Sequence, residues 1–76
     1  MNKTRREQLA DLYTKLVDLK TDLSGLQEEE QEYYDNMPES LQSGEKGEAA
    51  EAASCNLEEA VSDIEEALSK IEEAQA

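Results

Sequence analysis

The chain has 76 residues, of which 20 are acidic and 7 are basic, and its net charge is −13. A domain this small has a marginal hydrophobic core unless a staple or a partner supports it. It has no His and a single Cys, which excludes an internal disulfide and metal sites built from Cys and His. No apolar run could span a bilayer and the N-terminus shows no hydrophobic signal region, so we expect a cytoplasmic protein with no membrane contact and no cofactor.

The charge is distributed unevenly along the chain. Residues 1–24 carry five basic and four acidic side chains, whereas the rest of the chain carries sixteen acidic side chains and only two lysines. Repulsion is therefore concentrated in the second half, which disfavours direct binding of nucleic acid there. A basic surface on another protein would be attracted to it.

The first half of the chain carries leucines at alternating spacings of three and four residues, the heptad pattern of a helix that packs along another helix. A capping box formed by Thr4 and Glu7 marks its start, and Pro38 cannot continue it. We therefore predict a helix over about residues 4–35. The leucine row consists of Leu9, Leu12, Leu16, Leu19, Leu23 and Leu26.

A connection over about residues 36–47 follows, with room for one helical turn after Pro38. A second helix is predicted over about residues 48–74, where large apolar residues and alanines each recur every seven residues. Alternation of large residues with alanine favours close approach of the leucine helix. The large residues are Leu57, Ile64 and Ile71, and the alanine row is Ala53, Ala60, Ala67 and Ala74.

The predicted fold is all-α, a single antiparallel helical hairpin that resembles a coiled coil. Side chains flanking the two rows widen the apolar surface beyond what a two-helix contact covers, so we expect two hairpins to form a homodimeric four-helix bundle. The expected neighbours within the hairpin are Leu26 with Leu57, Leu19 with Ile64 and Leu12 with Ile71. The residues expected at the oligomer interface are Tyr13, Val17, Val61 and Leu68.

The second helix carries an acidic face with one pair of glutamates per heptad. Few Lys or Arg residues follow these glutamates by four positions, so their negative charge is largely not neutralised within the helix. One interpretation is a solvated outer face that keeps the bundle soluble. The other is a mimic of nucleic-acid charge that occupies a groove of Lys and Arg on another protein. The residues expected to bind such a partner are Glu58, Glu59, Glu65 and Glu66.

Glu30 occupies a position where the heptad pattern of the leucines predicts an apolar residue. It lies near Tyr33, Tyr34 and Ser54 in the predicted pairing, which leaves two interpretations: a wide, hydrated end of the bundle, or a polar pocket for a partner or a nucleotide signal. The acidic run that includes Glu30 is read as plain surface charge, with no metal. Without His or a nucleophile constellation, we predict that the protein is not an enzyme.

The segment DNMPESLQ at residues 35–42, together with NLEEA at residues 56–60, gives the chain a specific resemblance. It resembles a group of small acidic proteins from phages and prophages of Gram-positive bacteria, which combine a heptad helix, an acidic turn and an alanine- and glutamate-rich helix. No activity is assigned to that group, so no functional residues carry over. The resemblance implies a bacterial cytoplasm and a role in binding host defence or nucleic-acid machinery.

Three hypotheses follow from these patterns. The first is a phage-type, non-enzymatic protein that inhibits a host protein, such as a defence nuclease, through its acidic helix. The second is a structural or assembly module that only dimerises. The third is a protein that binds and sequesters a nucleotide signal, through Glu30, Tyr33 and Tyr34 at an oligomer interface.

Overall fold

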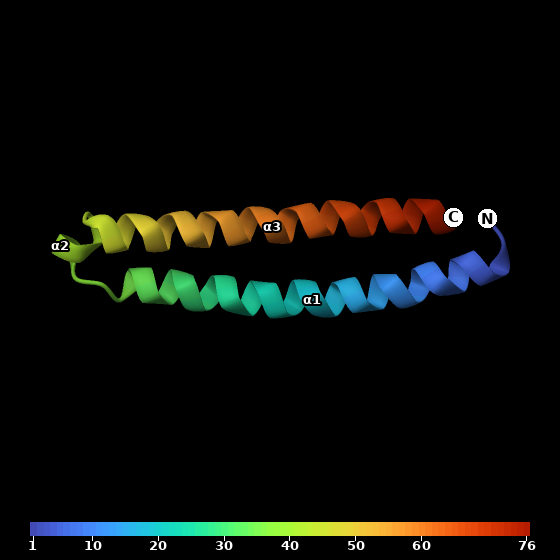
Figure 1. Cartoon of the computed structure of the whole chain (residues 1–76), viewed down its shortest axis with the longest axis horizontal. Coiled ribbons are helices and arrows are strands. Elements are labelled where there is room, and N and C mark those ends of the chain that lie inside the picture. The colour runs from blue at the N-terminus through green and yellow to red at the C-terminus, as the bar shows by residue number, and fades with distance from the viewer.

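The computed structural model describes all residues from Met1 to Ala76 as a hairpin of two long helices (Figure 1). Helix α1 spans Lys3–Asp35, the single-turn helix α2 spans Glu39–Gln42, and α3 spans Glu45–Gln75. The rod is 58 Å long and about 15 by 13 Å across, and both termini lie at the same end (Figure 1). The predicted all-helical fold is confirmed, and the helices begin and end within a few residues of their expected bounds.

The start of α1 differs from the predicted capping box. The side chain of Asn2 accepts a hydrogen bond of 2.8 Å from the backbone N–H of Arg5, and Thr4 is already inside the helix. Asn is among the strongest N-cap residues, and its position allows the helix to begin at Lys3. The capping role expected of Thr4 and Glu7 is therefore wrong.

The turn is tightened by contacts around Gln42. Its side-chain amide donates a hydrogen bond of 3.0 Å to the backbone oxygen of Tyr34, which ties α2 to the end of α1. On the other side, Gly47 of α3 is buried against the backbone of Gln42, where an added Cβ would lie only 2.1 Å from the Gln42 carbonyl oxygen. The glycine is thus required by the close approach of α2 and α3.

The inner interface between α1 and α3 is not the one expected from the alanine row. The buried residues of α3 are Gly47, Ala50, Ser54 and Leu68, whereas Ala67 and Ala74 are exposed. Leu68, predicted to flank the interface, is only 6% exposed. The row that α3 turns toward α1 consists of Gly47, Ala50, Ser54, Leu57, Val61, Ile64, Leu68, Ile71 and Gln75.

The register of the hairpin is close to the predicted one, but α1 is rotated. Tyr13 contacts Glu72 and Lys20 contacts Glu65, so each contact lies one residue further along both helices than the expected pairs of Leu12 with Ile71 and Leu19 with Ile64. The leucines of those pairs are more than half exposed. The exposed leucines of α1 are Leu12 at 54%, Leu19 at 59% and Leu26 at 56%.

These leucines and the alanine row lie on the same face of the hairpin. Leu12, Leu19 and Leu26 each precede by one residue a side chain that faces α3, and each alanine precedes a member of the inner row of α3. One residue is a rotation of about 100° around a helix. Because the helices are antiparallel, the same rotation on both leads to the same side of the hairpin.

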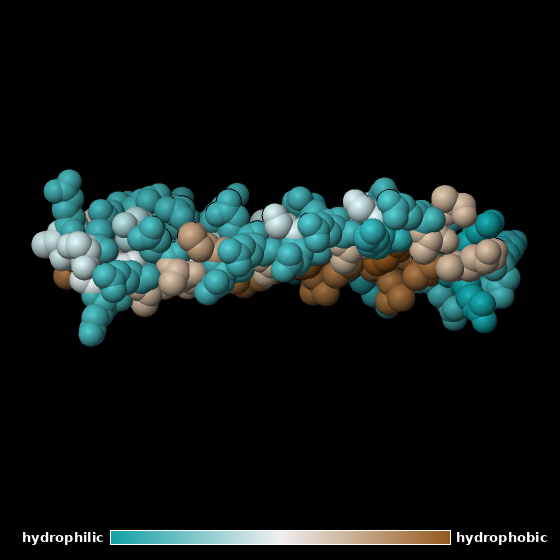
Figure 2. All heavy atoms as spheres, turned by 90° about the horizontal axis from the view of Figure 1, so that it is seen from above, coloured by the Kyte–Doolittle hydropathy of each residue, from teal (hydrophilic) through white to brown (hydrophobic).

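We call this side the Leu/Ala face. Figure 2 shows hydrophobic side chains gathered along one long edge of the rod, in the half that holds the termini, while the rest of that view is mainly hydrophilic. Neither long helix is apolar enough to cross a membrane. The Leu/Ala face consists of Leu12, Leu19, Leu26, Tyr33, Ala53, Ala60, Ala67 and Ala74.

Candidate functional site

A polar cluster interrupts the apolar inner interface near the turn. The Ser54 hydroxyl, 2% exposed as a residue, donates a hydrogen bond of 2.8 Å to the side-chain oxygen of Gln31. It also accepts a hydrogen bond of 3.1 Å from the side-chain amide of Gln27. The cluster satisfies the buried hydroxyl within the chain, which leaves Ser54 no free capacity to donate to a ligand.

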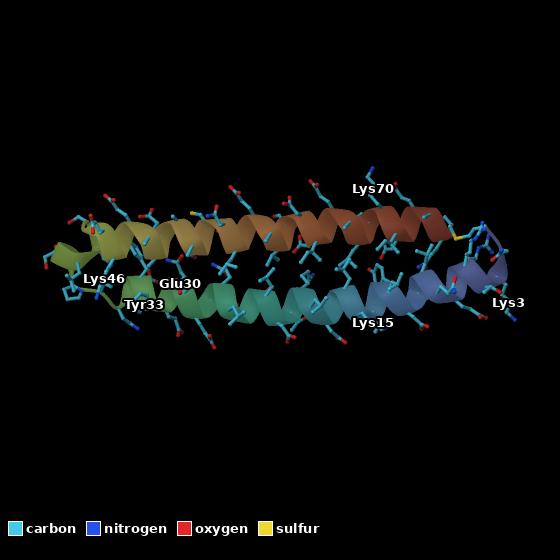
Figure 3. The ribbon with its side chains drawn as sticks, viewed as in Figure 1. Lys3, Lys15, Glu30, Tyr33, Lys46 and Lys70 are labelled. Atoms are coloured by element: carbon cyan, nitrogen blue, oxygen red, sulfur yellow. The ribbon has the colours of Figure 1, made fainter.

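Of the group expected around Glu30, which is itself half-buried, the structure separates Tyr33 from Tyr34. Tyr34 is half-buried against α3, where desolvation and then the nearby Glu51 carboxylate raise its pKa. Tyr33 instead lies 53% exposed on the Leu/Ala face. Figure 3 places Glu30 and Tyr33 in the part of α1 near the turn. Since the two tyrosines point to different sides and Ser54 is engaged elsewhere, the structure brings no stacked pair together for a nucleotide.

Tyr33 does line a shallow groove at the turn end of the rod. The groove is open to solvent and holds one cation, Lys46, beside apolar atoms. It does not include Tyr34 or Glu30. Its lining residues are Tyr33, Asn36, Met37, Pro38, Leu41 and Lys46.

At the opposite end of the hairpin, Tyr13 joins the two helices. Its hydroxyl donates a hydrogen bond of 2.6 Å to the carboxylate of Glu72. That hydrogen bond, followed by desolvation and the carboxylate charge, raises the pKa of Tyr13. Sequence reasoning assigned Tyr13 to an oligomer interface and did not anticipate this link.

The acidic residues of α3 form a continuous exposed strip along the rod, which we call the acidic ridge. Its glutamates repeat once per heptad, about 10.5 Å apart at the rise of an α-helix. The ridge consists of Glu58, Glu59, Glu65, Glu66, Glu72 and Glu73, all of which are exposed.

Most of the ridge has no cationic partner. The one ion pair in the chain joins Lys20 to Glu65 at 3.9 Å, and an exposed pair at this distance is weak. Lys70 follows Glu66 by four residues but forms no ion pair, and Figure 3 shows its side chain pointing away from α1. Of the four ridge glutamates predicted to bind a partner, Glu58, Glu59 and Glu66 therefore keep an uncompensated charge.

The surface beside these glutamates is shallow. An open depression on α3 is lined by Glu58 and Glu59 together with Asp63, Cys55 and Ser62. It has acidic walls and no cation, so it suits the tip of a basic side chain better than an anionic small molecule. No group of three or more His, Cys, Asp or Glu side chains is placed to hold a metal ion.

The four residues predicted at an oligomer interface are buried or half-buried in the hairpin. Leu68 is buried inside the hairpin, Tyr13 and Val61 are half-buried on the same inner surface, and Val17 is half-buried one residue beyond Leu16. The leucine row of α1 is divided between two sides: Leu9, Leu16 and Leu23 are half-buried, whereas Leu12, Leu19 and Leu26 are exposed. Comparisons with known proteins add no function: no family model, curated protein or solved structure matches the chain.

Proposed function

We propose that the protein is a non-enzymatic, homodimeric binding protein whose acidic ridge occupies a basic surface on another protein. The observation that supports this most is the ridge itself. It is exposed from Glu58 to Glu73 in the second half of α3, and Glu65 is the one ridge glutamate that forms an ion pair.

The chemistry of the ridge favours a surface that ordinarily holds nucleic acid. A groove of Lys and Arg built for a phosphate backbone binds largely through electrostatic attraction and the release of counterions. The carboxylates of the rod repeat regularly and are negative, like the phosphates of nucleic acid, so the same groove would attract them. Because the ridge belongs to a helix that is packed along its length, its carboxylates need little ordering on binding.

For the partner we propose a protein of a bacterial host, such as a defence nuclease, inhibited by the phage-type protein in the cytoplasm. This assignment draws on the resemblance of residues 35–42 and 56–60 to small phage and prophage proteins. The inhibitor would act by occupying the nucleic-acid groove, so it needs no catalytic group of its own.

Charge reversal tests this proposal. The variant E58K/E59K/E65K/E66K should lose capture of its partner from a Gram-positive host lysate, and the capture by the natural protein should weaken steeply with salt. The matched control reverses four exposed acids of α1, in the variant D11K/D18K/E28K/E32K, with the same change in net charge. Added DNA should displace the captured protein.

The ridge would be refuted as the binding surface if the ridge variant still captured the partner with the same salt dependence while the α1 variant lost it.

A second candidate function, an assembly module without inhibitory role, is favoured by the half-exposed leucines of α1. It predicts a stable dimer and no partner that depends on the ridge.

A further inference from the structure

We propose that two copies of this hairpin pack through their Leu/Ala faces into an antiparallel four-helix dimer, with α1 on α1, α3 on α3, and the two turns at opposite ends. The inference rests on the homodimer in the proposed function and specifies its surface and orientation. The sequence predicted other residues at this interface, one of which, Leu68, is buried inside the hairpin.

The first support is the apolar surface that the hairpin leaves uncovered. Leu12, Leu19, Leu26 and Tyr33 recur every seven residues along α1, and each is more than half exposed. The alanine row lies beside them on α3. The face runs from residue 12 to residue 33 on α1 and from residue 53 to residue 74 on α3, about 32 Å of each helix at the rise of an α-helix, and lies across the 15 Å width of the rod. A continuous apolar strip of this size marks an interaction surface.

The second support comes from exposed charges along the outer border of this face, four of which lie near the middle of the rod, while Glu29 continues the row on α1 toward the turn. Lys15 and Asp22 flank the leucines, each three residues after one leucine and four before the next. Asp63 and Lys70 flank the alanines with the same spacing. None of the four forms an ion pair within the chain. Near the middle of the rod, each helix thus carries one cation and one anion, seven residues apart, at positions that flank a helix contact.

Antiparallel packing of each helix on its own copy pairs these four central charges with opposite charges and sets Glu29 opposite the uncharged Gln8 of the second copy. If Leu19 lies opposite Leu19 of the second copy, Lys15 lies opposite Asp22 of the second copy, and symmetry repeats the pair. On α3 the same operation sets Asp63 opposite Lys70 of the second copy. The symmetry axis then passes α1 between residues 18 and 19, and α3 between residues 66 and 67.

The register of the hairpin shows that one axis can satisfy both helices. The contact of Lys20 with Glu65 places residues 18 and 19 of α1 level with residues 66 and 67 of α3. The two pairings were derived separately, and each alone locates the axis at the same height along the rod. This agreement is the main argument for the orientation.

The other face-to-face arrangement, with both turns at one end and α1 lying on α3, is disfavoured by the same charges. In the observed register, Lys15 would lie opposite Lys70 of the second copy. Asp22 would lie opposite Asp63 of the second copy. Like charges directly opposed at a helix contact destabilise it and select against that partner orientation.

The ends of α1 agree with the antiparallel arrangement. The first turns of α1 are basic, with Lys3, Arg5 and Arg6, and its last two turns are acidic. Antiparallel contact of α1 with its copy brings the basic end of one helix to the acidic end of the other, so the attraction acts at both ends of the dimer. It also places Arg5 level with Tyr33 of the second copy, where a cation can lie on an aromatic ring.

A charge-swap cycle measured by sedimentation equilibrium tests the orientation. K15E alone should raise the dimer dissociation constant about tenfold, because it turns two attractive contacts into repulsive ones. D22K alone should do the same, and K15E/D22K should restore the natural value. Thr14→Glu is the matched control: it adds an acid beside the same neighbours, Asp11 and Asp18, but on the opposite face of the hairpin, and should leave the dimer unchanged.

Disulfide trapping provides an independent readout. In a Cys55→Ser background, Leu19→Cys should form a covalent dimer on mild oxidation, because position 19 meets its own copy at the symmetry axis. Thr21→Cys, on the polar side of α1, should not. Circular dichroism on each variant confirms that the hairpin is still folded.

The outcomes separate the inference from the proposed function. A dimer that K15E tightens, or one that Leu19→Cys fails to trap, overturns the antiparallel arrangement while homodimerisation stands. A folded protein that sediments as a monomer at its highest soluble concentration overturns both the arrangement and the homodimer. Binding of a partner by the acidic ridge is measured by the separate reversal of Glu58, Glu59, Glu65 and Glu66.

Discussion

The hydroxyl of Ser54 on α3 donates a hydrogen bond of 2.8 Å to the side-chain oxygen of Gln31 on α1. The same hydroxyl accepts from Gln27, so a single small side chain holds two long amides across the helix contact. Heptad reasoning would assign an apolar residue to this inner position. The polar cluster also makes the contact directional, because only one alignment of the helices satisfies all three side chains.

Ser54→Ala should therefore lower the free energy of unfolding by about 1–2 kcal/mol, through the loss of two partly buried hydrogen bonds. Urea denaturation at a fixed protein concentration measures this. Ser62→Ala is the control, since Ser62 is exposed and makes no side-chain hydrogen bond in the structure. Equal stability of the two variants would show that the cluster contributes nothing.

Two helical glycines should respond to alanine in opposite directions. At Gly47 the new methyl group would meet the backbone of Gln42, so Gly47→Ala should destabilise the fold by about 1–3 kcal/mol. At Gly25 nothing lies within 4 Å of an added Cβ, and Gly25→Ala should stabilise the helix by up to about 1 kcal/mol. Thermal unfolding of both variants against the natural chain is the measurement. A neutral Gly47→Ala would mean that α2 does not pack on α3.

The start of α1 can be tested by removing the observed cap and the predicted one in turn. Asn2→Ala should cost about 0.5–1 kcal/mol, because it removes the acceptor for the N–H of Arg5. Thr4→Ala should leave stability nearly unchanged, because Thr4 lies inside the helix and makes no capping hydrogen bond. Helicity and melting temperature of the two variants distinguish the caps, and the reverse ranking would restore the capping box.

Stability should fall at alkaline pH through the tyrosines that face α3. The folded-state pKa of Tyr13 and of Tyr34 is raised above the ordinary value of about 10, in Tyr13 mainly by its hydrogen bond to Glu72 and in Tyr34 mainly by desolvation. Both contributions are fully present below about pH 10, where the tyrosines are neutral in either state. Above about pH 10, the tyrosines of the unfolded chain ionise before those of the folded chain. Ionisation stabilises the unfolded state, so the free energy of unfolding falls as the pH rises.

The measurement compares unfolding at about pH 9 and about pH 11 for the natural chain and for Tyr13→Phe/Tyr34→Phe. The natural chain should lose more stability over that interval than the variant. Tyr33→Phe serves as the control, because Tyr33 lies on the exposed Leu/Ala face. An identical loss in the natural chain and the double variant would show that neither tyrosine is linked to folding.

Much of the architecture could be predicted from particular residues. The leucine row and Pro38 located the first helix, and the seven-residue repeat of Leu57, Ile64 and Ile71 located the second. Their antiparallel register followed because a short connection allows little else. The acidic ridge was equally visible, since exposed glutamates at a heptad repeat need no tertiary partner to be recognised.

The sequence alone thus determined the helices, their register and the charge of each stretch, because these depend on local periodicity and composition. Only the tertiary structure decided which face of each helix turns inward. The apolar strip predicted from a heptad row is about 100° wide. Two rows that are one residue apart are rotated by about 100° around the helix, so periodicity alone does not tell which row faces inward. Close packing at Gly47, the hydrogen bonds of Ser54 and the link from Tyr13 to Glu72 act between helices. Together they favour an inner side of α1 that keeps Leu9, Leu16 and Leu23 half-buried and excludes the other three leucines. This packing buried Leu68, left Leu12, Leu19 and Leu26 half exposed, and created the face on which the dimer is proposed.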